Sequence, residues 1–354
     1  MRLYPDDQQR ALAYQTEALQ DFPSLTGDQL ERIRKKSRES LVWFRAHPVL
    51  HNTISVLLLL CLFAADVLAL LGLPALLPVE LDTARGATLA GVVAGVLHGF
   101  LVCSIVTLTV HEGAAHDLLI QGRGPVARAL RLLANNACRL FAADPLYYSE
   151  AHFAHHRSLG TPEDGSFTNF VRLRRLLGAL APLAPVLSVS DYFPWRPQEH
   201  TRSRNLSAVL TTLYMTSLGV LAYWRFGATY TLVALLLVGT WVSYALDRVR
   251  ESVEHLFMPL HRDDGTRELG LGFWGLLLGG GPWGQPCHLS HHLAPALPWY
   301  QQLGMHFFLR RLLTDEQKRH FFLRPFVGFP LLVWGLVTGR GPAPRSTPRA
   351  AGAV

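Results

Sequence analysis

Long apolar blocks alternate with basic, polar segments along the chain. The blocks cover residues 53–77, 87–110, 206–223 and 228–246. Each is close to the length of about 20 residues with which a helix crosses the hydrocarbon layer of a membrane. Residues 78–85 join the first two blocks, and a few residues around Gly227 join the other two. The pattern predicts an all-α integral membrane protein whose four transmembrane helices form two hairpins.

The first 48 residues are polar and charged, in contrast to the apolar block after them. The stretch from Ser24 to Ser40 has a helical pattern, with Thr26 or Asp28 as the N-cap. We therefore expect a cytosolic helical segment before the first membrane span.

Three further segments lie outside the predicted spans. Residues 125–142 and 170–190 combine Arg with apolar residues, as interfacial helices do. Residues 326–338 are apolar but too short to cross a membrane comfortably, so we place them in the interface. The predicted divisions are a cytosolic segment (1–48), a membrane and metal-binding domain (49–325) whose histidines lie in a helical cap on the spans, and an interfacial segment with a disordered tail (326–354).

Composition agrees with a membrane protein. Hydrophobic residues make up 49% of the chain and charged residues 17%, and the mean hydropathy is +0.19. Basic residues gather in the N-terminal segment, in 117–205 and after 247, whereas the hairpin tips carry only Arg85 and Arg225. Basic flanks mark the cytoplasmic side, so both termini are expected there. The Arg residues fit no nucleic-acid-binding motif, and we expect no nucleic-acid partner.

The net charge of +7 leaves two interpretations open. A basic surface suits anionic lipid headgroups or an acidic electron donor. A genome that prefers Arg codons would give the same excess of Arg over Lys.

Histidines gather in three boxes on the predicted cytoplasmic side. The first spans His111 to His116, where the second apolar block ends, and the other two share the pattern H-x2-H-H. Helical residues three and four positions apart lie on one face, so each of these two boxes is expected to point its imidazoles the same way. The predicted metal ligands are His111, His116, His152, His155, His156, His255, His288, His291 and His292. A zinc site takes three or four protein ligands, so nine indicate two ions.

Other residues near the boxes are candidates for supporting roles. Metal-bound imidazoles usually donate their second N–H to a carboxylate or carbonyl, and Asp164 and Glu254 are well placed in sequence to accept it. A surface salt bridge is the alternative for each. Arg250 is a candidate for binding a substrate carboxylate. A zinc protease is excluded, because its H-E-x-x-H motif has histidines four apart, and His111 and His116 are five apart.

The remaining histidines have simpler interpretations. His98 lies inside an apolar block, where an interhelical hydrogen bond is favoured over a functional role. The others are expected to be interfacial or solvated: His47, His51, His200, His261, His306 and His320.

The boxes resemble those of a known family. The order H-x4-H, H-x2-H-H and a later H-x2-H-H, with a paired span between the last two and Pro295-x-x-Pro298-Trp299-Tyr300 after the third, resembles the membrane fatty-acid desaturase-like superfamily. Glu254-His255 is similar to an extra histidine found there upstream of the third box. The resemblance implies a non-haem di-iron enzyme that uses O2 as co-substrate to remove hydrogen from a C–H bond of a lipid.

The resemblance favours a membrane di-iron oxidoreductase for fatty acyl chains. Desaturation and the oxidative decarboxylation of a free fatty acid to a terminal alkene both remain open. One alternative is a hydroxylase or ketolase of another lipid, such as a carotenoid or sphingoid base. A non-redox zinc-binding membrane protein is the alternative from another class. We expect a separate electron donor, such as ferredoxin with its reductase, and a bacterial inner membrane with the active site on its cytoplasmic side.

Overall fold

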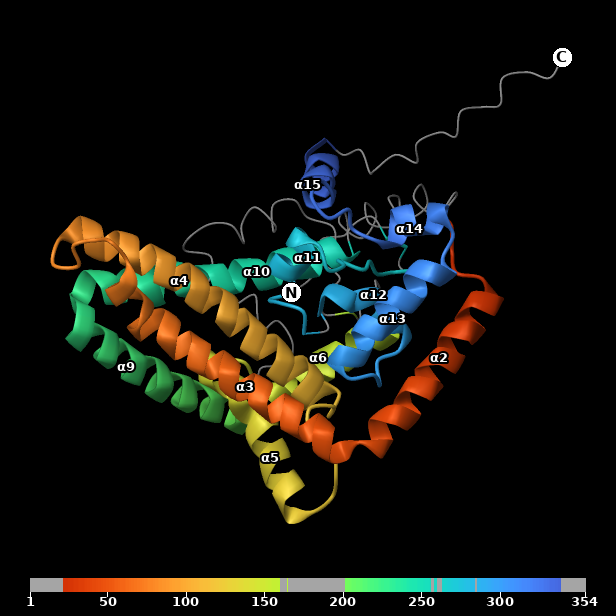
Figure 1. Ribbon diagram of the computed structural model, residues 1–354, viewed down its shortest axis with the longest axis horizontal. Coiled ribbons are helices and arrows are strands. Elements are labelled where there is room, and N and C mark those ends of the chain that lie inside the picture. Colours follow the sequence, from red (N-terminus) through yellow and green to blue (C-terminus); the bar gives the residue numbers. More distant parts are fainter. Residues whose placement is uncertain are drawn as a thin grey trace.

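The computed structural model describes residues 22–159, 164, 201–255, 258–259, 263–283 and 285–338 (Figure 1). Within these residues the regular elements are all helices, and one parallel bridge joins Glu268 to Phe322. The predicted all-α class is confirmed. The interfacial segment 170–190 and the tail from residue 339 lie outside the described residues.

Two long helices form the first hairpin. Helix α3 (Pro48–Leu71) begins with proline at its first turn, where a missing N–H costs nothing. The short 3-10 helix η1 (Leu73–Leu76) comes next. Helix α4 (Ala84–Val106) is capped by Thr83, and it continues as the π-helical segment η2 (Thr107–Ala115). Both helices are long and apolar enough to cross a membrane.

The third long helical stretch is bent. It comprises α9 (Thr201–Thr231), the π-helical η5 (Leu232–Gly239) and α10 (Thr240–His255). The backbone leaves helical geometry at Gly227, with φ 82° and ψ 179°, a conformation that only glycine adopts readily. In Figure 1, α9 leads to the end of the bundle at which the chain turns, and α10 leads away from that end. In the described part of the chain, three helices are long and apolar enough to cross a membrane, and this stretch is one of them. Four separate spans therefore remain a prediction.

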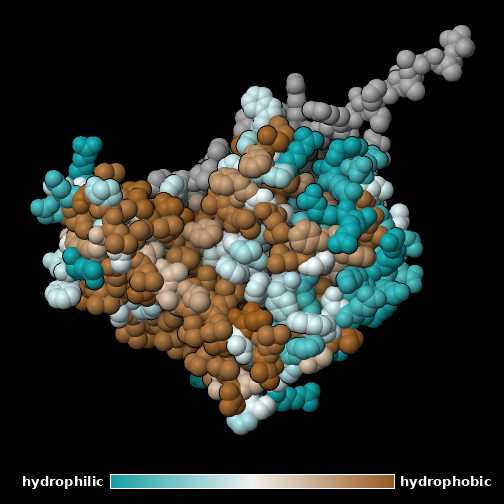
Figure 2. All heavy atoms as spheres, in the orientation of Figure 1, coloured by the Kyte–Doolittle hydropathy of each residue, from teal (hydrophilic) through white to brown (hydrophobic). Residues whose placement is uncertain are grey.

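Small residues let α4 pack closely against η5. A side chain at Gly95 would place its Cβ 2.8 Å from the carbonyl oxygen of Ala234, and one at Gly99 would lie 2.6 Å from that of Gly239. Within lipid, where apolar surface alone does not drive association, such close backbone contact is a main source of helix pairing. Figure 2 shows the outer surface of the helical hairpins to be largely hydrophobic, with hydrophilic residues over α2 and α14.

A polar pair lies inside the bundle. The Nδ1 atom of His98 on α4 is 2.6 Å from Oδ1 of Asp66 on α3, and both side chains are buried. The hydroxyl of Tyr214 on α9 lies 3.5 Å from Oδ2 of the same carboxylate. His98 is thus an interhelical partner, as expected, and three helices share one polar contact.

The remaining helices form a cap at one end of the hairpins. Helix α2 (Gly27–Ala46) begins at Thr26, whose side chain accepts the N–H of Gln29 in a capping box. This helix extends beyond the predicted Ser40. The others are α5 (Pro125–Asn136), η3 (Ala137–Phe141), α6 (Pro145–Ser158), α11 (Phe273–Leu278), η6 (Gln285–Cys287), α12 (His288–Leu293), α13 (Trp299–Leu312), α14 (Asp315–Phe321) and α15 (Gly328–Thr338). A core of fully buried side chains, including Leu289 and Met305, packs α12 and α13 against α2.

Candidate metal centre

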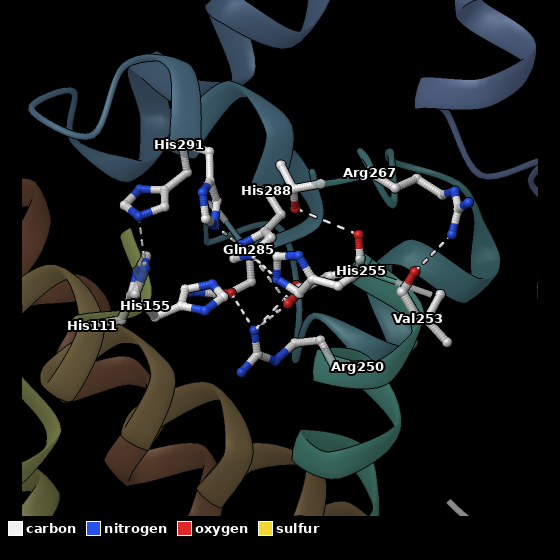
Figure 3. Close-up of polar contacts among 12 residues, drawn as sticks. His111, His155, Arg250, Val253, His255, Arg267, Gln285, His288 and His291 are labelled. Carbon is white, nitrogen blue, oxygen red and sulfur yellow. Dashed lines mark hydrogen bonds and ion pairs between the residues drawn. The ribbon is translucent and has the colours of Figure 1, made fainter. Parts of the chain in front are cut away.

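The three histidine boxes converge where the hairpins meet the cap. In the first box, His111 lies on η2 and His116 is the C-cap residue just after it. The second box lies on α6 and the third on α12, while His255 ends α10. Figure 3 shows His111, His155, His255, His288 and His291 directed toward one another from these elements. The structure thus brings together every histidine that the sequence proposed as a ligand, although their binding of metal stays a prediction.

The imidazoles form two groups. The first centre contains His111, His116, His152 and His291, and the second contains His155, His255, His288 and His292. Within each group, one ring nitrogen per residue lies within 4.8 Å of the others. His156 joins the first centre, because its Nε2 is 3.0 Å from the Nε2 atoms of both His152 and His291.

Each H-x2-H-H box is divided between the two centres. Helix α6 contributes His152 and His156, four residues apart, to the first centre and His155 to the second. Helix α12 does the reverse, since only His291 of its three histidines lies in the first centre. The expectation that each box would point all its imidazoles one way is therefore too simple.

The spacing of the ring nitrogens fits metal ions. The Nε2 atoms are 2.8 Å apart in His116 and His152, 3.1 Å in His111 and His291, and 3.3 Å in His255 and His288. Ligands at right angles around an ion at about 2.1 Å would be about 3.0 Å apart. A neutral ring nitrogen is either a donor or an acceptor, so several Nε2 atoms directed at one point are best satisfied by a cation.

Hydrogen bonds at the other ring nitrogen orient two ligands of the second centre. Nδ1 of His155 lies 3.1 Å from both carboxylate oxygens of Asp164, which is 2% exposed. Nδ1 of His255 donates to the carbonyl oxygen of Gly265 at 2.9 Å. Each contact leaves Nε2 facing the centre, the arrangement typical of metal-binding histidines. Asp164 is thus where its proposed supporting role requires it.

Arg250 lies within a network of its own. Its Nη1 donates to Glu254 Oε2 at 2.9 Å and to Gln285 Oε1 at 2.7 Å (Figure 3). Its Nη2 donates to Oδ1 of Asp247 at 2.9 Å. Oε2 of Glu254 in turn lies 3.4 Å from Nε2 of His288. The guanidinium therefore holds Glu254 beside the second centre. The binding of a substrate carboxylate by Arg250 stays a prediction.

Burial favours the neutral form of several box histidines outside the helical spans. Desolvation lowers the pKa of His116 to about 4. Desolvation, together with the charges of neighbouring histidines, holds the pKa of His152, His288 and His291 well below the usual value of 6.5. Neutral imidazole is the form that binds metal, so these side chains are ready ligands at neutral pH.

Sequence reasoning missed several buried polar residues near the centres. Glu112 is 1% exposed, its Oε1 lies 3.6 Å from Nδ1 of His111, and its Oε2 has no hydrogen-bond partner among the described residues. Its position between two box histidines was a usable signal. His51 and His306, expected at the interface or in solvent, are each only 1% exposed, so that expectation was wrong. Glu268, which contacts His306, has no motif around it that could have revealed it.

Comparison with known proteins yields one match. The sequence model of the family described as fatty acid desaturase matches residues 86–338, which is more than half of the chain and includes all three boxes. No curated protein and no solved structure matches the chain.

Proposed function

The chain belongs to the fatty acid desaturase family, and from this we propose that it is an O2-dependent di-iron oxidase that activates a C–H bond of a fatty acyl chain. Membership makes it a membrane oxidoreductase of the kind that acts on lipids. The observation that carries the finer proposal is the pair of buried histidine clusters at the ends of α4 and α10. These clusters lie where apolar helices enter the polar cap, so a lipid substrate and a soluble electron donor can both reach them.

Two iron ions suit the donor set. Imidazole binds iron, zinc, copper and nickel, and iron among these gives the O2 chemistry of the family. The first ion would be held by His111, His116, His152, His156 and His291, and the second by His155, His255, His288 and His292. When bound, such a pair supplies the oxidising power needed to remove hydrogen from an unactivated C–H bond.

The protein supplies orientation around these ions. Asp164 fixes the ring of His155 so that Nε2 faces the second centre. We assign Glu254 as the carboxylate at the edge of that centre, and Arg250 as the residue that positions it through contacts of 2.9 Å and 3.1 Å. Burial of these side chains excludes water from the place where hydrogen is removed.

Two outcomes fit this site. In desaturation, two adjacent carbons each lose a hydrogen and a C=C bond forms. In decarboxylation of a free acid, the β-carbon loses a hydrogen, the C–C bond to the carboxylate breaks, and CO2 leaves with formation of a terminal alkene. In both, the substrate gives up two electrons, a donor such as ferredoxin with its reductase supplies two more, and O2 is reduced to two molecules of water.

The same features support a membrane arrangement. We propose that the chain lies in a bacterial inner membrane, with the centres on the cytoplasmic side where the donor is available. The basic residues that flank the long helices support this orientation.

Product analysis after expression in bacterial cells tests the proposal. Gas chromatography should find a new terminal alkene in the headspace or new double bonds in the membrane lipids, and purified protein should contain two irons per chain. His291→Ala should abolish the product, and His47→Ala, which alters an exposed histidine outside both centres, should not. Hydroxylated lipid, or an oxidised carotenoid or sphingoid base after feeding, would instead support the other lipid oxidases. Zinc without iron, and no product, would overturn the proposal in favour of a non-redox zinc protein.

A further inference from the structure

The third histidine box lies on a short helix that does not cap itself. Helix α12 has six residues, His288–Leu293, and its N-cap residue Cys287 makes no side-chain hydrogen bond to the first turn. So short a helix is not stable alone, and its first N–H groups need partners from elsewhere. The imidazoles of this helix must nevertheless reach two different centres. Their placement therefore depends on what holds the first turn.

Glu268 holds this turn from 22 residues away in the sequence. Its Oε2 accepts the backbone N–H of Ser290 at 3.0 Å, and its Oε1 accepts the Ser290 hydroxyl at 2.8 Å. Ser290 is the third residue of α12, where a helix N–H lacks a partner within the helix. Negative charge at this end of a helix also stabilises it. Glu268 thus acts as a cap supplied by a distant segment.

Glu268 is itself fixed by its surroundings. Its backbone N–H donates to the carbonyl oxygen of Phe321 at 2.7 Å, and its carbonyl oxygen accepts the N–H of Leu323 at 2.8 Å. Nδ1 of His306 on α13 lies 2.8 Å from Oε1. Glu268 is fully buried and His306 nearly so. The carboxylate of Glu268 therefore ties α12 to α13, and its backbone ties the same residue to the end of α14 and the chain just after it.

We propose that Glu268, together with His306, is a positioning group for the di-iron site, and that it sets how the third box is divided between the two centres. This inference rests on the proposed function, because it requires both centres to hold metal. Cys287 lies beside the pair, and ligand atoms of Glu268, Cys287 and His306 come within 4.8 Å of one another. Both carboxylate oxygens already accept hydrogen bonds, so the geometry assigns a hydrogen-bonded anchor and not a third metal site.

Metal binding by purified full-length variants tests this role. Glu268→Gln removes the charge and one acceptor, and Ser290→Ala removes one donor. Iron affinity, measured by competition with a chelator, should fall roughly 10- to 100-fold in Glu268→Gln, the usual effect of losing an outer partner of a metal site. The Mössbauer spectrum of the iron that remains should change. His306→Asn, which keeps a donor near the Nδ1 position, should retain more iron than His306→Leu.

A loss of stability alone would not produce this result. Thr83→Ala removes the N-cap of α4 at the end opposite the first box, and it should lower the unfolding temperature while leaving iron affinity unchanged. The inference is overturned if Glu268→Gln keeps the affinity and spectrum of the parent, or if the parent holds a third metal that Cys287→Ser removes. A parent protein that binds no iron would overturn the proposed function itself. A parent that binds iron, with Glu268→Gln binding it equally well, would overturn only the positioning role of Glu268, so the two failures are distinguishable.

Discussion

Replacing Asp164 should weaken one metal centre and spare the other. The carboxylate is 2% exposed and contacts Nδ1 of His155 through both oxygens at 3.1 Å. Asp164→Ala removes the contact that orients this ring and lets the ring place its proton on Nε2, where the proposed metal would bind. A hydrogen bond to a charged group contributes about 1.5–3 kcal/mol, which corresponds to roughly a 10- to 150-fold change in affinity.

The assay is competition between the protein and a chelator in detergent, with iron loading measured at both sites. We expect the affinity of the second centre, which contains His155, to fall by the factor above and that of the first centre to change much less. Asp315→Asn is the matched control, because that carboxylate is 87% exposed and far from the boxes in sequence. Equal loss at both centres, or no loss at either, would refute the orienting role of Asp164.

Three other changes test the bundle and the pKa values. Asp66→Leu should lower the free energy of unfolding by about 3 kcal/mol, because it leaves the buried His98 without this partner. Adding His98→Leu should restore part of the lost stability. Thermal unfolding in detergent tests this, and a double variant whose loss is the sum of the two single losses would contradict it. Gly99→Val should destabilise the protein by about 1–3 kcal/mol, because the new side chain would meet the backbone of η5, whereas Gly219→Ala should leave the stability unchanged. Equal free energies of unfolding for the two variants in a denaturant titration would count against close packing of α4 and η5. The free energy of unfolding of the metal-free protein should be greatest above pH 6.5 and should decrease as the pH falls toward about 4. The reason is that His116 binds a proton in the unfolded chain in this pH range but stays neutral in the folded protein, where its pKa is about 4. Urea midpoints that do not change between pH 7 and pH 5 would contradict this.

Much of the architecture could be predicted from local patterns. Long apolar blocks identify membrane helices because each helix satisfies its own backbone hydrogen bonds, whatever its neighbours are. The bend at Gly227 coincides with the break between the second pair of blocks, and the start of α2 depends on the polar side chain of Thr26. The box histidines were recognisable because their spacing is unusual.

The parts that depend on tertiary contacts could not be predicted. The spacing of His152, His155 and His156 does not say that the middle residue faces a second centre, since this depends on where α10 and α12 lie. The same is true of Glu268 and His306, which are 38 residues apart and meet only after folding. Two partners of Arg250, Asp247 and Glu254, lie three and four residues away on α10 and were within reach of sequence reasoning, whereas the third, Gln285, meets it only after folding.

The divided histidine boxes have a consequence for how the protein acquires metal. If the centres hold the two ions of the proposed function, a first ion can be bound only when α6 and α12 have adopted the orientation that also assembles the neighbouring centre. Occupation of one place thus lowers the conformational cost of filling the next. When iron is scarce, molecules should therefore be mostly empty or mostly complete, and the inactive species with a single ion should be rarer than random loading predicts.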